Sequence, residues 1–156
     1  MAPEAICPPA RSTASSMAPK PAFADSAFLY ALVDRRDAAH LPAVESLRTL
    51  VAAQRRIVST DYVVSEALTL TKVRAGSQAA IRLLDRLEAT DILTFEWIGP
   101  DRFESAKAIF RKHADHGYSF TDCTSFVVMR ELGLHEALTT DRHFAAAGFQ
   151  PLLPTV

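Results

Sequence analysis

The sequence predicts an α/β fold, a three-layer α/β/α sandwich around a mainly parallel sheet of four or five strands. Short apolar segments alternate with longer segments whose apolar residues recur at the spacing of an amphipathic helix. Strands connected by such helices run parallel, because the crossover returns the chain to the same edge of the sheet. The 156 residues contain no repeat and no interior linker, so we expect one domain over residues 21–156.

Strands and paired helices alternate through the first half of the chain. We expect a strand, two helices, a strand and two further helices, at residues 21–25, 27–37, 41–55, 56–59, 61–74 and 81–87. The helix after the second strand can be capped by Ser59 or Thr60 and carries Asp61 in its first turn. Gly76 is expected to end it, because glycine readily adopts the left-handed backbone found at helix C-termini.

The second half continues this alternation with a strand, two helices and one or two further strands. The expected ranges are 92–98, 101–113, 122–132, 136–140 and, for the last strand, 149–153. Gly99 and Pro100 separate the first of these strands from its helix, and a polar loop precedes the helix that starts at Asp122. In such a fold, ligands bind outside the carboxyl ends of the strands.

The composition is that of an ordinary globular protein, with 49% hydrophobic and 22% charged residues. Residues 1–20 are rich in Pro, Ala and Ser, which predicts a disordered N-terminal extension and not a secretory signal. No segment is apolar for long enough to span a membrane. Of the two cysteines, Cys7 falls in the extension and Cys123 inside a predicted helix, so we expect no disulfide and a cytoplasmic protein.

Four carboxylates occur where a folded domain rarely places charge. Asp25 and Asp141 each follow a short apolar run, and Glu66 and Asp122 each lie on the apolar stripe of a predicted helix. An ionised carboxylate beside apolar surface costs free energy unless a cation pairs with it. Oxygen ligands suit a hard divalent cation, so the four acids together predict a site for Mg²⁺ or Mn²⁺.

Each acid also has a purely structural explanation when it is considered alone. Asp25 and Asp141 are of a residue type that is favoured in turns and at strand ends. Asp122 could simply complement the dipole of its helix. Glu66 could pack its stem against the helix and keep its carboxylate in water. The metal-site interpretation therefore depends on the four acids meeting in the folded chain.

Three polar residues near these acids are candidates for supporting roles. Ser26 follows Asp25 and Thr140 precedes Asp141, so their hydroxyls could orient the carboxylates, or each could only cap a helix. His143 follows Asp141 closely and could position the site, contact a phosphate, or simply pack.

The contexts of the four acids resemble the PIN domain, and most closely the VapC-type toxins of bacterial toxin–antitoxin pairs. The resemblance covers residues 22–153 and rests on the segments ADSAFLYAL, STDYVVSEALTL and YSFTDCTSFVVMRELGLHEALTTDRHFAAAGF. It implies a PIN-like fold and a ribonuclease with a Mg²⁺ or Mn²⁺ site. The catalytic and metal-binding acids of the family then fall on Asp25, Glu66, Asp122 and Asp141, and its supporting polar residues on Ser26 and Thr121.

The resemblance also implies partners. A VapC-type toxin has a cognate antitoxin that folds along it and blocks the site. Homodimers are expected from the family, and Leu and Phe positions on the early helices are plausible contacts. The net charge of -1 gives no general attraction to an RNA substrate, so RNA would need a local basic rim. Candidates for this rim are Arg35, Arg36, Lys72, Arg74, Arg111 and Lys112.

Three other functions fit part of the pattern. A phosphatase of the haloacid-dehalogenase type would use Asp25 as a nucleophile, but it requires a second Asp where this chain has Ala27. A non-catalytic RNA-binding domain of the same fold would be expected to lack acids, and all four are present. An RNA-processing nuclease without an antitoxin would carry the same residues. A neighbouring antitoxin gene is the observation that separates it from a toxin.

Overall fold

Five parallel strands form the centre of the structure, a computed structural model that describes residues 18–156. They are β1 (Ala22–Ala24), β2 (Ile57–Thr60), β3 (Leu93–Glu96), β4 (Glu136–Leu138) and β5 (Gln150–Pro151). Their order across the sheet is β3-β2-β1-β4-β5, and every pair of neighbours is parallel. The predicted parallel sheet is confirmed. The predicted disordered extension falls, for residues 1–17, outside the described part of the chain.

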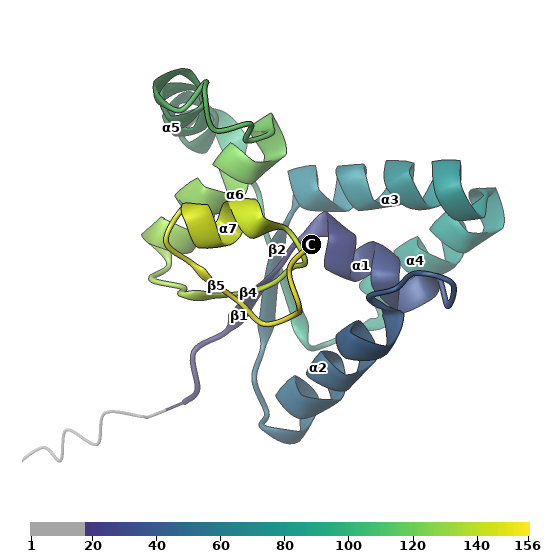
Figure 1. The fold of residues 1–156 in the computed structure, drawn as a ribbon. Coiled ribbons are helices and arrows are strands. Elements are labelled where there is room, and N and C mark those ends of the chain that lie inside the picture. The colour runs from purple at the N-terminus through teal and green to yellow at the C-terminus, as the bar shows by residue number, and fades with distance from the viewer. Residues whose placement is uncertain (1–17) are drawn as a thin grey trace, which may run out of the picture.

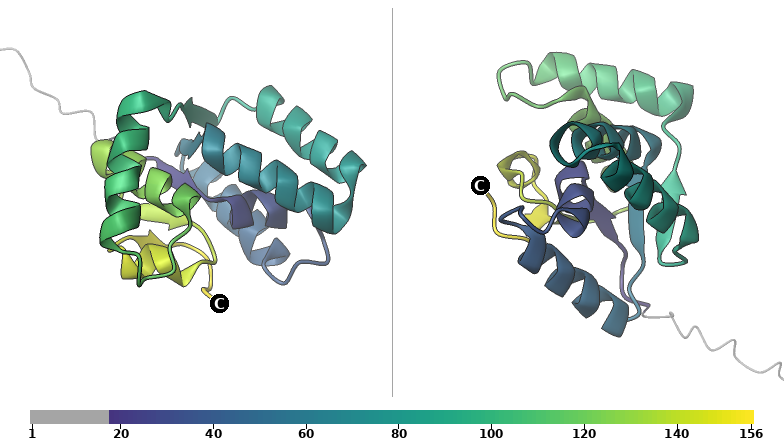
Figure 2. Two further views of the ribbon diagram at one scale, coloured as in Figure 1. Left: turned by 90° about the horizontal axis from the view of Figure 1, so that it is seen from above. Right: turned by 90° about the vertical axis from the view of Figure 1, so that its right-hand side faces the viewer.

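Helices cover both faces of this sheet, as the alternation of elements predicts. They are α1 (Ser26–Val33), α2 (His40–Ala52), α3 (Asp61–Ala75), α4 (Ser77–Ala89), α5 (Gly99–Lys112), α6 (Phe120–Glu131) and α7 (Arg142–Ala146). The first four pack together on one face, α6 and α7 lie on the other, and α5 packs on α6 (Figure 1; Figure 2 gives the view from above). The three-layer α/β/α sandwich is therefore confirmed. Within residues 18–156, no helix combines the length and the apolar character needed to cross a membrane.

The first helix is shorter than predicted and ends at Val33 instead of residue 37. Asp34 follows it with extended backbone, and its carboxylate accepts hydrogen bonds from the Tyr30 hydroxyl at 2.6 Å and the Arg36 amide at 3.0 Å. These bonds hold the chain in a turn. A short acid that binds nearby donors competes with helical geometry, which residue spacing does not reveal.

The sequence did not predict α7. Its five residues are too few to show a helical period. Its start is fixed by Asp141, whose carboxylate accepts a hydrogen bond from the His143 amide at 2.8 Å. A capping residue, and not amphipathic spacing, therefore defines this short helix.

Both α5 and α6 begin two residues before their predicted starts. Pro100 fits the first turn of α5, because a backbone N–H has no helical partner there. Ser119 caps α6, and Phe126 in the middle of that helix is fully buried. The Phe126 ring packs on Tyr118 at 5.1 Å and on Phe144 at 5.2 Å between ring centroids. These contacts fix the N-terminus of α6 relative to α7 and the sheet.

The winding of the sheet reverses between β1 and β4. The connection that follows β1 leads to α1 on one face, and the connection that follows β4 leads to α7 on the other (Figure 1). Open α/β sheets bind ligands outside the carboxyl ends of such a pair of strands. The register pairs Ala24 with Leu138, so the residues that come next, Asp25 and Thr139, leave the sheet side by side.

Candidate active site

Asp25 and Asp141 are linked through the hydroxyl of Thr139. The Thr139 Oγ1 donates a hydrogen bond to Asp25 Oδ2 at 2.9 Å and accepts one from the Asp141 amide, also at 2.9 Å. Thr139 is fully buried, and Asp25, directly after β1, is only 4% exposed. The ends of two neighbouring strands thus bring two of the sequence-predicted acids together.

Glu66 reaches the same place from α3 through Ser26. The Ser26 hydroxyl donates a hydrogen bond to Glu66 Oε1 at 2.6 Å and lies 3.5 Å from Asp25 Oδ1. The Ser26 amide donates to the same Asp25 oxygen at 2.7 Å, which caps α1. Glu66 lies on the apolar side of α3 with Tyr62 and Val73, as expected. The expectation that this is not a solvated face is wrong, because Glu66 is exposed and Val73 is 80% exposed. This side of α3 faces open space.

Asp122 lies in the first turn of α6, where a capping box holds its carboxylate. Its Oδ2 accepts a hydrogen bond from the Ser119 amide at 2.9 Å, and the Ser119 hydroxyl accepts one from the Asp122 amide at 3.0 Å. Asp122 is buried to all but 6% of its surface. The reciprocal bonds fix the orientation of the carboxylate before any ligand binds.

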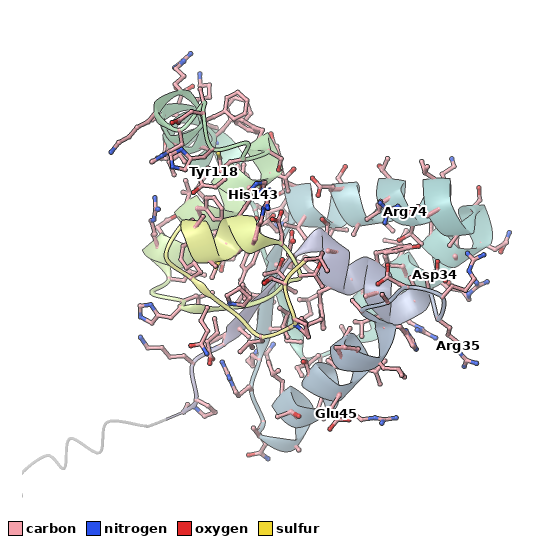
Figure 3. All side chains as sticks on the ribbon, in the orientation of Figure 1. Asp34, Arg35, Glu45, Arg74, Tyr118 and His143 are labelled. Atoms are coloured by element: carbon pink, nitrogen blue, oxygen red, sulfur yellow. The ribbon has the colours of Figure 1, made fainter. Side chains whose placement is uncertain are left out.

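His143 on α7 stands beside both Asp122 and Asp141. Its Nδ1 lies 3.2 Å from Asp141 Oδ1 and 3.6 Å from Asp122 Oδ2. Figure 3 shows His143 next to Tyr118, above the C-terminal helix. Within the described residues, Asp122, Asp141 and His143 each offer a ligand atom within 4.8 Å of the other two. The third and fourth acids and one imidazole therefore form a compact group.

Burial and mutual repulsion act on the two most buried acids. The pKa of Asp25 is raised from 3.8 to about 7, chiefly by desolvation, with repulsion from Asp122 and Glu66 adding to the effect and hydrogen bonds opposing it. Desolvation also raises the pKa of Asp122, and the nearby Asp141 raises it further. Ionising all four carboxylates at once is therefore unfavourable unless a cation balances their charge.

The cluster fits a hard divalent cation. Four carboxylates from β1, α3, α6 and the segment after β4 converge, and in the described part of the chain none of them forms an ion pair with Arg or Lys. A set of carboxylates that ranges from the buried Asp25 and Asp122 to the exposed Glu66, and that lacks an Arg or Lys partner, matches the oxygen-ligand preference of Mg²⁺ and Mn²⁺. Such an ion would hold all the carboxylates ionised.

The supporting residues differ in part from those expected. Ser26 contacts Asp25 and Glu66, as the sequence suggested. The hydroxyl that links Asp25 to the Asp141 backbone belongs to Thr139 and not to its neighbour Thr140. The sequence did not single out Thr139, because only the strand register shows which of two adjacent threonines faces the site.

Ser119 is the second residue that was missed, and a signal for it was present. Ser119 and Asp122 have the spacing of a capping box, in which an acid follows a hydroxyl residue after two intervening positions. Thr121, which the family resemblance singled out, accepts a hydrogen bond at its carbonyl from the Thr124 hydroxyl at 2.7 Å. Thr121 also lines a groove that runs along α3.

A groove of about 680 Å³ runs along the open side of α3 next to the cluster. Glu66 and Thr121 form its boundary with the acidic site. The complete lining is Asp61, Tyr62, Ser65, Glu66, Thr69, Leu70, Val73 and Thr121. The groove therefore opens beside the Glu66 carboxylate.

Comparisons with known proteins match most of the chain. The PIN domain family matches residues 22–150. Two proteins named 23S rRNA-specific endonuclease VapC20, from Mycobacterium tuberculosis strains CDC 1551 / Oshkosh and ATCC 25618 / H37Rv, are each 34% identical over 133 residues, covering 85% of this chain and 98% of the relative. The crystal structure of Mycobacterium tuberculosis VapC20, described as a sarcin–ricin loop cleaving toxin, is 32% identical with a TM-score of 0.75. The match to this structure covers 85% of this chain and 98% of the VapC20 chain.

Asp25→Asn is expected to stabilise the metal-free protein at neutral and alkaline pH. The folded state raises the Asp25 pKa from 3.8 to about 7, so it binds more protons than the unfolded chain between these values. Stability of the wild type therefore falls as pH rises through this window. Asn carries no charge, so the variant does not lose stability in this way as pH rises. At about pH 8, the free energy of unfolding of Asp25→Asn should exceed that of the wild type by up to about 4 kcal/mol.

Urea denaturation in EDTA measures this difference. The gap between Asp25→Asn and the wild type should become small near pH 4, because the folded wild type is protonated there and the unfolded chain has released only part of its proton. The exposed Asp91 provides the control, and Asp91→Asn should show no comparable dependence on pH. An equal gap at both pH values would contradict a protonated Asp25.

Proposed function

Because the chain belongs to the PIN domain family, and within it to the VapC-type toxins, we propose that it is a metal-dependent endoribonuclease and the toxin of a toxin–antitoxin pair. The resemblance read from the sequence is confirmed by the family match over residues 22–150. The observation that carries the chemical proposal is the convergence of four carboxylates at the β1–β4 reversal, where no Arg or Lys of the described residues pairs with them.

The cluster has the composition that phosphodiester hydrolysis requires. A bound divalent cation activates water, neutralises phosphate charge and stabilises the leaving oxygen. In our proposal Asp25, Asp122 and Asp141 hold Mg²⁺ or Mn²⁺, and Glu66 either binds it or orients the attacking water. Thr139 fixes Asp25 by a hydrogen bond, which reduces the reorganisation needed when substrate binds.

We propose RNA as the substrate and 23S rRNA as the first RNA to test. The VapC20 relatives are named for 23S rRNA cleavage, and one is described as cleaving the sarcin–ricin loop. Because the net charge is -1, a polyanion needs a local group of cations, and we propose that the predicted rim residues supply it. Figure 3 shows Arg35 and Arg74 at the same end of the helical layer. The six predicted rim residues are all exposed, namely Arg35, Arg36, Lys72, Arg74, Arg111 and Lys112.

A cognate antitoxin is the proposed protein partner, and the cytoplasm is the proposed compartment. Membership of the VapC-type toxins supports both, because an unrestrained ribonuclease would damage the cell that makes it. The alternative is an RNA-processing nuclease with the same site and no antitoxin. A small reading frame beside the gene, whose product suppresses the growth defect and co-purifies with this chain, would decide for the toxin.

We also propose a homodimer that forms through the side of the molecule bordered by α3 and α5. Apolar side chains are exposed there, with Val73 80%, Phe110 46% and Phe103 37% accessible. Val73 lines the groove along α3, and the Phe103 ring packs 6.5 Å from that of Tyr62 at the end of the same groove. Exposed apolar patches of this kind mark association surfaces. Leu41 on α2, an early-helix position of the type that the sequence favoured, is 77% exposed and offers the competing surface.

Asp25→Asn and Asp122→Asn should each reduce RNA cleavage by on the order of 100-fold or more, because each removes a charged ligand of the cation. A gel assay on a 23S rRNA fragment that contains the sarcin–ricin loop, with MgCl₂ or MnCl₂ and with EDTA, measures the effect. Asp101→Asn, an exposed first-turn acid of α5, should retain full activity. Full activity in either folded site variant, or cleavage in EDTA, would contradict the proposal.

Val73→Arg should convert the proposed dimer to a monomer, because it places a charge in the apolar contact. Size-exclusion chromatography with light scattering measures the mass in solution. Leu41→Arg is the matched control, since it introduces the same residue at an equally exposed position and should leave the dimer intact. Dissociation by Leu41→Arg alone would move the interface to α2, and a monomeric wild type would refute the dimer.

A further inference from the structure

One imidazole nitrogen lies between two carboxylates that come from different elements. The Nδ1 of His143 is 3.2 Å from Asp141 Oδ1 and 3.6 Å from Asp122 Oδ2, and ligand atoms of the three residues lie within 4.8 Å of one another. Adjacent ligands of an octahedral ion are about 3.0 Å apart when each bond is about 2.1 Å long. The two separations from Nδ1 are slightly larger than this, and all three ligand atoms lie within 4.8 Å of one another, so the carboxylates need to move inward when an ion binds.

These contacts are not hydrogen bonds of the kind that imidazoles make elsewhere in the described chain. The His40 Nδ1 lies 2.7 Å from the Ala31 carbonyl oxygen, with good hydrogen-bond geometry. The contacts from His143 to Asp141 and Asp122 are longer, and neither has that geometry. The ring nitrogen thus faces the carboxylates without being hydrogen-bonded to them, which is the relation between neighbouring ligands of one ion.

Packing holds the His143 ring in this position. Tyr118 is 9% exposed and meets the ring edge-on, with centroids 5.5 Å apart and planes at 80°. Figure 3 shows the two side chains beside one another. Tyr118 in turn packs on the fully buried Phe126 of α6. An imidazole that is oriented before binding loses little conformational freedom when it takes a ligand position.

We propose that His143 Nδ1 is a ligand of the metal site, and that this nitrogen makes the site prefer a divalent transition-metal ion such as Mn²⁺ over Mg²⁺. The proposal rests on the metal site of the proposed function and adds a ligand and a selectivity to it. Four carboxylates alone would accept either ion, because both bind oxygen. An imidazole changes this balance, because Mg²⁺ strongly favours oxygen ligands and transition-metal ions also accept nitrogen.

Pulsed electron paramagnetic resonance of Mn²⁺ bound to the full-length protein without RNA tests the ligand directly. The wild type should show modulation from an imidazole nitrogen, and His143→Ala should lose it. In calorimetry, the same substitution should weaken Mn²⁺ binding by roughly 10- to 100-fold. Mg²⁺ binding should weaken by no more than about threefold, because Mg²⁺ replaces the nitrogen with water readily.

His135→Ala removes an exposed histidine and should change neither the nitrogen modulation nor the affinities. Should His143→Ala fold poorly by circular dichroism, His143→Gln keeps a polar side chain and also removes the imidazole. Nitrogen modulation that persists without His143, or equal weakening of the two ions, would overturn the proposal and leave the metal site standing. A wild type that binds neither ion would overturn the metal site as well.

Discussion

At the centre of the site, one buried hydroxyl holds two acidic segments together. The Thr139 hydroxyl donates a hydrogen bond to the Asp25 carboxylate and accepts one from the Asp141 amide. These two bonds hold the end of β1 against the segment that follows β4. This contact exists only because β1 and β4 are neighbours in the correct register, with Ala24 opposite Leu138. A shift of one residue would turn Thr139 to the other face of the sheet. The position of the cluster therefore depends on that single strand pairing, and the helices supply the remaining acids around it.

The like charges gathered there are a local cost that the rest of the fold must offset. Desolvation raises the pKa of both Asp25 and Asp122, which means that their ionised forms are disfavoured in the folded state. The opposing contributions come from backbone amides at helix N-termini and from the packing around Phe126, which anchors α6. Sites whose polar groups are arranged for a ligand and not for stability are common in enzymes. Here the arrangement is rigid, since hydrogen bonds from backbone amides fix the carboxylates of Asp25, Asp122 and Asp141.

The sequence alone was sufficient for the parallel sheet, for the order of every element except α7, and for the convergence of the acids. Periodicity located six of the helices to within a few residues, and Asp25 and Asp122 stood out because acids are rare beside apolar runs. Most of the misses depend on local hydrogen bonds or on strand register. The early end of α1 follows from the bonds of Asp34, and α7 exists because of a cap. The open side of α3 could not be recognised, because an apolar stripe has the same spacing whether it faces a core or a solvent-filled groove.

The distance along the chain between the partners of the central hydrogen bond has a consequence for how the protein is made. Asp25 and Thr139 are separated by 114 positions, and β1 lies in the middle of the sheet with β4 at its side. During synthesis β1 leaves the ribosome before β4, so the edge of β1 that pairs with β4 has no partner until β4 has been made. The acids after β1 and β4 can meet only after the segment that follows β4 has left the ribosome. Until then, each nascent chain carries an incomplete acidic cluster.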